Sequence, residues 1–94
     1  MSTVRVLLAD DHALVRAGIR NALQELSGLE IVSEVADGPS LASALATVEP
    51  DLLLVDLTMP AFEPLSALRQ IRVDHPDLVI LVISAYDDDI YVQG

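Results

Sequence analysis

The sequence predicts an α/β fold in which a parallel sheet is covered by helices. Two observations lead to this prediction. Short apolar runs alternate along the chain with stretches of helical periodicity. Several of these runs are apolar at nearly every position, which is typical of strands buried on both faces. The expected order is β-α-β-α-β-α-β, followed by the start of a fourth helix. A chain of 94 residues has the length of one small domain.

The first half of the chain is predicted to hold two strands and two helices. Residues 4–9 form a short apolar run that is rich in branched side chains and ends at two aspartates. This pattern indicates a buried strand. Residues 12–26 have helical periodicity and are followed by Ser27-Gly28. The apolar positions in this helix are Leu14, Val15, Ile19, Ala22, Leu23 and Leu26. Residues 29–36 alternate more between apolar and polar positions, which favours an edge strand. A turn at 37–40 then leads into a helix over 41–48.

The second half repeats the pattern. Every position of its first strand is apolar, and two prolines mark the loop that follows. Its helix is ended by His75-Pro76. The elements are a strand over 52–55, a loop over 59–64, a helix over 65–72, a strand over 78–83 and the start of a helix at Asp87-Asp88-Asp89.

The charge balance limits the partners of this chain. Fifteen acidic residues stand against five basic ones, all arginine, for a net charge of −10. Such a chain is a poor ligand for nucleic acid or an anionic membrane, but it attracts cations and basic surfaces. The chain has no cysteine, which excludes disulfides and thiolate zinc sites. No apolar run approaches the roughly 18 residues of a membrane span, and the N-terminus does not resemble a signal peptide. We therefore expect a cytoplasmic location.

Polar residues follow three of the predicted strands. Asp10 and Asp11 follow the first, Asp56 the third and Ser84 the fourth. In open parallel sheets, sites lie at the carboxyl ends of the strands, so these side chains are expected at one edge. Crowded carboxylates repel one another, and a divalent cation such as Mg²⁺ would relieve the repulsion. The alternative is that each aspartate only caps the helix or turn that follows.

Three segments together give the chain a resemblance to a known family. They are residues 6–12, 51–60 and 82–85. The chain resembles the receiver domain of two-component response regulators, most closely receivers joined to a LuxR/NarL-type DNA-binding domain. The resemblance runs from Thr3 to Gly94. It implies a flavodoxin-like, doubly wound parallel sheet with strand order 2-1-3-4.

The resemblance also implies a metal site and a phosphoacceptor. Asp56 matches the aspartate that accepts the phosphoryl group. Asp11 matches the direct Mg²⁺ ligand, and Asp10 matches the acid that usually reaches the metal through water. Asp56 and the backbone carbonyl of Thr58 complete the implied ligand set. A carboxylate is a suitable nucleophile toward phosphorus, and phosphoryl transfer needs mainly positioning and charge neutralisation.

Further positions are implied to contact the phosphoryl group. Ser84 matches the hydroxyl that hydrogen-bonds it and couples it to the switch. The amides of Thr58 and Ala85 would face its oxygens, and Thr58 and Tyr86 would tune its lifetime. For His12, a surface or capping role is favoured over a contact with the phosphodonor. For His75, a structural role at a helix end is favoured.

The sequence departs from the family pattern in two places. The family carries an essential lysine on a fifth strand, and this chain has no lysine. We therefore expect residues 1–94 to be a receiver domain that lacks the fifth strand and the last helix. The exposed edge of the fourth strand is then expected to self-associate. DNA would be bound only through a C-terminal domain absent from this chain. Ala61 and Pro64 stand where the family often has glycine.

Three classes of function follow. The leading one is a regulatory, Mg²⁺-dependent phosphoacceptor with a histidine kinase as donor, catalysing only its own phosphorylation and dephosphorylation. The second is a non-phosphorylatable pseudo-receiver or a dimerisation module. The third is an enzyme. A nucleotide hydrolase would need a glycine-rich phosphate loop, which this sequence lacks. A haloacid-type phosphatase would need an aspartate at the position of Thr58. A flavin-binding relative would need loops rich in Ser, Thr and Gly after the strands to bind phosphate, and this sequence lacks them.

Overall fold

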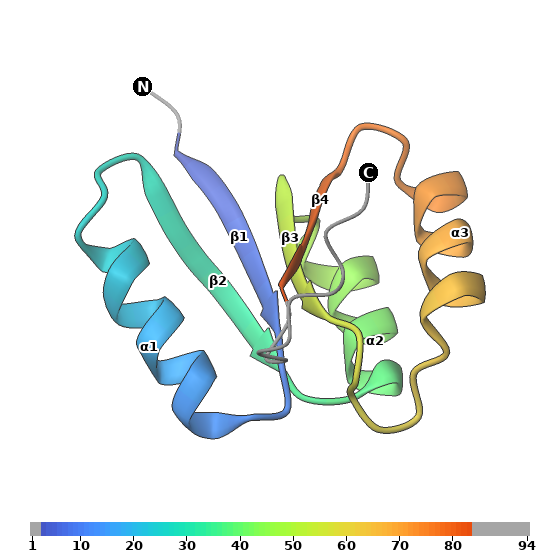
Figure 1. Cartoon of the computed structure of the whole chain (residues 1–94). Coiled ribbons are helices and arrows are strands. Elements are labelled where there is room, and N and C mark those ends of the chain that lie inside the picture. The colour runs from blue at the N-terminus through green and yellow to red at the C-terminus, as the bar shows by residue number, and fades with distance from the viewer. Residues whose placement is uncertain (1–2, 84–94) are drawn as a thin grey trace.

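The computed structural model describes residues 3–83, which form a four-stranded parallel sheet flanked by helices (Figure 1). The elements are β1 (Val4–Ala9), α1 (Ala13–Gln24), β2 (Leu29–Val35), α2 (Gly38–Val48), β3 (Leu52–Asp56), α3 (Pro64–Asp74) and β4 (Val79–Ile83). The strand order is β2-β1-β3-β4 and every pair is parallel. The predicted fold class, the order 2-1-3-4 and the edge position of β2 are confirmed. The helix predicted at Asp87-Asp88-Asp89 lies outside the described residues.

Two helices begin earlier than predicted because of their capping residues. The helix expected from residue 41 begins at Gly38, where the Asp37 carboxylate accepts a 2.7 Å hydrogen bond from the amide of Ser40. Pro64 was predicted to belong to a loop, but it is the first residue of α3. Proline suits the first turn of a helix, because the amide it lacks has no partner there.

Side chains on the two sides of the sheet form separate apolar clusters. On what we call the α2/α3 face, residues of β1 and β3 pack with α2 and α3. The buried members are Leu7, Ala9, Leu41, Ala44, Leu45, Leu53, Val55, Met59, Ile71 and Leu78. On the α1 face, the buried members are Val6, Leu8 and Leu54, packed against half-buried residues of α1 that include Ile19 and Leu23. Adjacent residues of a strand thus support opposite faces.

An irregularity in β2 changes which face its residues support. Val6 pairs with Ile31, whereas the next residue of β1, Leu7, pairs with Ser33. Val32 is therefore an extra residue in β2. As a result, Ile31 packs on the α1 face while Val35 packs on the α2/α3 face. Strict alternation would have placed these two residues on the same face.

The apolar face predicted for α1 is only partly used. Ile19 and Leu23 pack on the sheet, but Leu14 is 84% exposed. Leu14 and Leu23 are nine residues apart, which places them about 180° apart around a helix. Leu26 follows the end of α1 and is also exposed. The prediction was wrong for these two leucines, because apolar character alone did not fix which side of the helix meets the sheet.

Helices long and apolar enough to cross a membrane are absent from residues 3–83.

Candidate functional site

The register of the sheet brings two aspartates together. β1 and β3 are parallel neighbours, and Ala9 pairs with Val55. The next residue of each chain segment is an aspartate, so Asp10 and Asp56 lie side by side at the carboxyl edge. Each is only 1% exposed. The amide of Asp10 donates to the carbonyl of Val35 at 3.0 Å, which ties this edge to β2.

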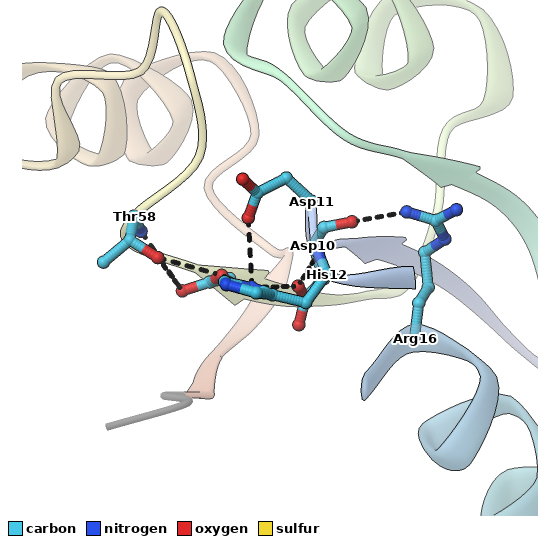
Figure 2. Close-up of polar contacts among 6 residues, drawn as sticks. Asp10, Asp11, His12, Arg16 and Thr58 are labelled. Carbon is cyan, nitrogen blue, oxygen red and sulfur yellow. Dashed lines mark hydrogen bonds and ion pairs between the residues drawn. The ribbon is translucent and has the colours of Figure 1, made fainter. Parts of the chain in front are cut away.

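His12 lies among three carboxylates (Figure 2). Its Nδ1 atom is 3.2 Å from Oδ1 of Asp10, 3.1 Å from Oδ1 of Asp11 and 3.4 Å from Oδ2 of Asp56. The side chains of Asp11 and His12 are 28% and 47% exposed, so this end of the cluster opens to solvent. The hydrogen bond to Asp10 and the charge of Asp11 raise the pKa of His12 above its usual range.

The side chain of His12 is 47% exposed, as its interpretation as a surface residue predicts, but it also makes contacts that this interpretation does not include. His12 occupies the N-cap position of α1, but within the described residues its side chain caps no helix amide. The imidazole turns to the carboxylates instead, because their negative charge attracts it. The sequence held one signal for this, a histidine directly after two acids at a strand end.

Thr58 orients the carboxylate of Asp56 (Figure 2). The Thr58 amide donates to Oδ1 of Asp56 at 3.1 Å. Its hydroxyl lies 3.0 Å from Oδ1 and 3.1 Å from Oδ2. A buried carboxylate needs such donors to replace the hydrogen bonds it loses from water. The metal-ligand role predicted for the Thr58 carbonyl stays a prediction.

Arg16 is a site residue that the sequence pattern does not predict. Its guanidinium donates to the backbone carbonyl of Asp10 at 2.7 Å (Figure 2) and, through Nε, to Oε1 of Glu34 at 3.1 Å. Arg20 also binds Glu34, at 2.8 and 2.9 Å. These contacts join α1 and β2 to the end of β1. The available signal was the position of Arg16, one helical turn after His12.

The acidic cluster fits a divalent cation. One ligand atom from each of Asp10, Asp11, His12 and Asp56 lies within 4.8 Å of the others. Oδ1 of Asp11 is buried and accepts no hydrogen bond from any described residue. Nδ1 of His12 carries at most one hydrogen, and its hydrogen bond goes to Asp10. The imidazole therefore cannot donate to all three carboxylates. Mg²⁺ takes oxygen ligands of this kind. Ser84 and Ala85, the other predicted site residues, lie outside the described residues, and so does Tyr86.

Comparison with known proteins identifies the class of protein to which this fold and this acidic edge correspond. The chain belongs to the response regulator receiver domain family, whose model matches residues 6–94. Receiver domains are regulatory modules of two-component signalling, and they generally bind Mg²⁺ in an acidic pocket. The family predicted from residues 6–12, 51–60 and 82–85 is confirmed.

Individual relatives are response regulators. The chain is 34% identical over 86 residues to the response regulator GacA of Pseudomonas viridiflava, which covers 92% of this chain and 40% of GacA. It is 36% identical over 87 residues to VraR of Staphylococcus aureus, covering 93% of this chain and 42% of VraR. The chain therefore spans about two fifths of the length of these relatives.

Solved structures of RcsB have the same fold. RcsB of Salmonella typhimurium superposes with a TM-score of 0.85 at 29% identity, covering 92% of this chain and 44% of that one. The non-phosphorylated receiver domain of RcsB from Escherichia coli gives a TM-score of 0.84 at 28% identity, over 93% of this chain and 69% of that one.

Proposed function

We propose that this chain is a phosphoacceptor switch, in which Asp56 receives a phosphoryl group from a histidine kinase with Mg²⁺ as cofactor. The observation that carries the proposal is the environment of Asp56. Its carboxylate is buried, is oriented by two donors of Thr58 and faces Asp10 and Asp11 across a cluster that fits a cation. Family membership supports the same assignment.

The residues divide the chemistry among them. An oxygen of Asp56 attacks phosphorus, the bond from phosphorus to the donor's imidazole nitrogen breaks, and that nitrogen keeps the electron pair. Asp10, Asp11, Asp56 and the Thr58 carbonyl are the proposed Mg²⁺ ligands. When bound, Mg²⁺ neutralises charge on the phosphoryl oxygens. The Ser84 hydroxyl and the amides of Thr58 and Ala85 are proposed to contact those oxygens.

The proposed switch follows from the charge added at Asp56. An aspartyl phosphate places several strong acceptor oxygens and about 1.5 to 2 negative charges where one carboxylate lay. This charge appears at a buried position next to Asp10. Its neighbours have to rearrange their hydrogen bonds, which is how a local modification reorders adjacent loops.

Intact mass spectrometry after incubation with acetyl phosphate tests the proposal. We expect a gain of one phosphoryl group that requires Mg²⁺ and disappears in Asp56→Asn. Asp11→Ala should remove the part of the gain that depends on Mg²⁺, because a proposed ligand of the ion is lost. Asp77→Asn is a matched control, because this exposed acid precedes β4 at the opposite edge of the sheet. Phosphorylation of Asp56→Asn would show that the acceptor assignment is wrong.

The alternative proposal is a pseudo-receiver or dimerisation module. It is favoured by β4, the last strand of the described sheet, where Val79, Leu81 and Val82 are exposed. An exposed apolar strand edge is a template for pairing with a second copy. We expect a mass by light scattering that rises with concentration in the wild type but not in Leu81→Lys. Val73→Lys, on an exposed apolar residue of α3, is the control. A monomer at every concentration would contradict self-association.

The proposal extends to a longer protein, because the curated relatives are longer than this chain. We propose that such a protein regulates transcription through a LuxR/NarL-type DNA-binding domain C-terminal to these residues. One RcsB structure contains two dimers bound to two DNAs. The net charge of −10 supports placing DNA contacts outside this chain. We place the signalling in the cytoplasm, where ATP-dependent kinases supply phosphoryl groups.

A further inference from the structure

Arg16 joins the end of β1 to the neighbouring strand β2 through two hydrogen bonds. Its Nη1 atom donates to the backbone carbonyl of Asp10 at 2.7 Å (Figure 2), and its Nε atom donates to Oε1 of Glu34 at 3.1 Å. The side chain of Arg16 is 25% exposed, so most of it is withdrawn from water. Because a guanidinium is planar, two bonds in different directions fix its orientation.

The charge of Glu34 does not by itself explain the placement of Arg16. Nη1 of Arg20 already lies 2.8 and 2.9 Å from the two carboxylate oxygens of Glu34. One guanidinium is enough to balance one carboxylate. The shorter bond of Arg16 is the one to the Asp10 carbonyl. We therefore interpret Glu34 and Arg20 as holding Arg16, and Arg16 as acting on Asp10.

The carbonyl that Arg16 binds belongs to the peptide that joins Asp10 to Asp11. The carboxylate of Asp10 accepts a 2.7 Å hydrogen bond from the amide of His12. Oδ1 of Asp11 accepts no hydrogen bond within residues 3–83, and its ion-pair partner is the half-exposed imidazole of His12. The direction of the Asp11 side chain therefore depends on its backbone. Because a peptide group is planar, a bond to the Asp10 carbonyl also fixes the position from which that side chain starts.

We propose that Arg16 is a positioning residue of the phosphoacceptor site, where it holds the Asp10 carbonyl and thereby directs the Asp11 carboxylate toward Mg²⁺. Glu34 and Arg20 hold Arg16 in turn. This inference rests on the proposed function, since Asp11 is a ligand of the ion only there. The consequence is that a contact between α1 and β2, outside the acidic cluster, sets the affinity of the cluster for Mg²⁺.

A competing explanation makes Arg16 only an ion-pair partner of Glu34. The two explanations predict opposite changes in Mg²⁺ affinity when the guanidinium is removed. Removing a positive charge near a cation site strengthens cation binding. Removing a positioning contact weakens it, because Mg²⁺ requires nearly ideal octahedral geometry.

Titration calorimetry with Mg²⁺ on the wild type, Arg16→Gln and Arg20→Gln separates these explanations. The control is matched, because both arginines lie on α1 and bind Glu34, but of the two it is Arg16 that also binds the Asp10 carbonyl. We expect Arg16→Gln to raise the Kd for Mg²⁺ by about tenfold, since losing an outer contact of a metal ligand costs roughly 10–100-fold. Arg20→Gln should leave the Kd within about threefold, because an exposed ion pair contributes little. No weakening in Arg16→Gln, or equal weakening in both variants, would overturn the inference.

Partial unfolding of Arg16→Gln would weaken Mg²⁺ binding in a different way. If unfolding alone caused a tenfold rise in the apparent Kd, only about one tenth of the chains would be folded without the ion. Circular dichroism of the metal-free variant measures the folded fraction. We expect it to match that of Arg20→Gln, and a folded fraction low enough to account for the whole rise in Kd would overturn the inference.

NMR of the metal-free chain gives an independent readout. We expect Arg16→Gln to shift the amide resonance of Asp11 and to lower its order parameter, with no comparable change in Arg20→Gln. An Asp11 amide as rigid as in the wild type would overturn the inference. If the wild type binds Mg²⁺ and Arg16→Gln binds it equally well, only the inference fails. If the wild type does not bind Mg²⁺, the metal site of the proposed function fails as well.

Discussion

The two faces of the sheet differ in how completely they are packed. Within residues 3–83, the α2/α3 face has ten buried apolar residues drawn from strands, helices and loops. The α1 face has three, all from β1 and β3. In the described part of the chain, two helices cover the first face and one covers the second (Figure 1). The strands β1 and β3 bury apolar residues on both faces, so the difference comes from the covering elements. Six of the ten residues on the α2/α3 face belong to helices and loops, whereas α1 has no buried residue.

The helices on the two faces also differ in how their first turns are capped. α2 and α3 begin at side-chain caps supplied by Asp37 and Glu63. At the start of α1, His12 directs its side chain to the acidic cluster instead. The α2/α3 face is thus the structural half of the domain, while the start of α1 belongs to the site.

The largest expected effect comes from neighbouring leucines of β3 that support opposite faces. Leu53→Ala should lower the free energy of unfolding by about 4 kcal/mol, and Leu54→Ala by about 2–3 kcal/mol. Leu53 is completely buried in the larger cluster, whereas Leu54 is slightly exposed on the α1 face. Urea unfolding curves measure both values. A greater loss for Leu54→Ala would contradict the comparison.

Two glycines test how tightly the faces are packed. A Cβ atom at Gly38 would collide with the backbone carbonyl of Ala61, so Gly38→Ala should cost about 1–3 kcal/mol. Gly18 lies inside α1, and among the described residues no neighbour approaches a Cβ built there. Gly18→Ala should therefore stabilise by about 0.5–1 kcal/mol. Thermal unfolding of both variants should give shifts of opposite sign.

A smaller effect is expected in the loop after Asp56. Ala61 has a φ of 53°, in the left-handed region that favours glycine. Ala61→Gly removes this strain but also loosens the unfolded chain, so we expect a net stabilisation of about 0.5 kcal/mol. Urea unfolding of this variant beside the wild type provides the measurement. A destabilised variant would show that the loop tolerates the alanine without strain.

The smallest effect concerns the pH dependence of the α2 cap. Hydrogen bonds from Ser40 hold the pKa of Asp37 below its ordinary value. Its stabilising contribution is therefore complete above the unfolded-state pKa, about 3.9, and is lost as the pH falls through the folded-state pKa. Asp37→Asn should keep its cap at acid pH, so its stability relative to the wild type should rise as the pH falls. A pH-independent difference would contradict the assignment.

Much of the fold could be predicted because it depends on local patterns. Apolar runs predicted all four described strands to within about one residue at each end, since strand burial appears directly in composition. Helix starts are less predictable, because the sequence places Pro39 and Pro64 in a turn or loop although both lie in first helical turns. Proline is compatible with both environments.

The candidate site, like the fold, is predictable from the sequence only in part. The sequence alone determined that aspartates follow β1 and β3, and a parallel sheet then requires Asp10 and Asp56 to meet at one edge. Only the tertiary structure decided the extra residue Val32, the contact of Arg16 with the Asp10 carbonyl and the direction of the His12 imidazole. Local periodicity specifies which elements form. Side-chain direction depends on charges and register contributed by segments distant in the sequence, and these act only once the sheet has assembled.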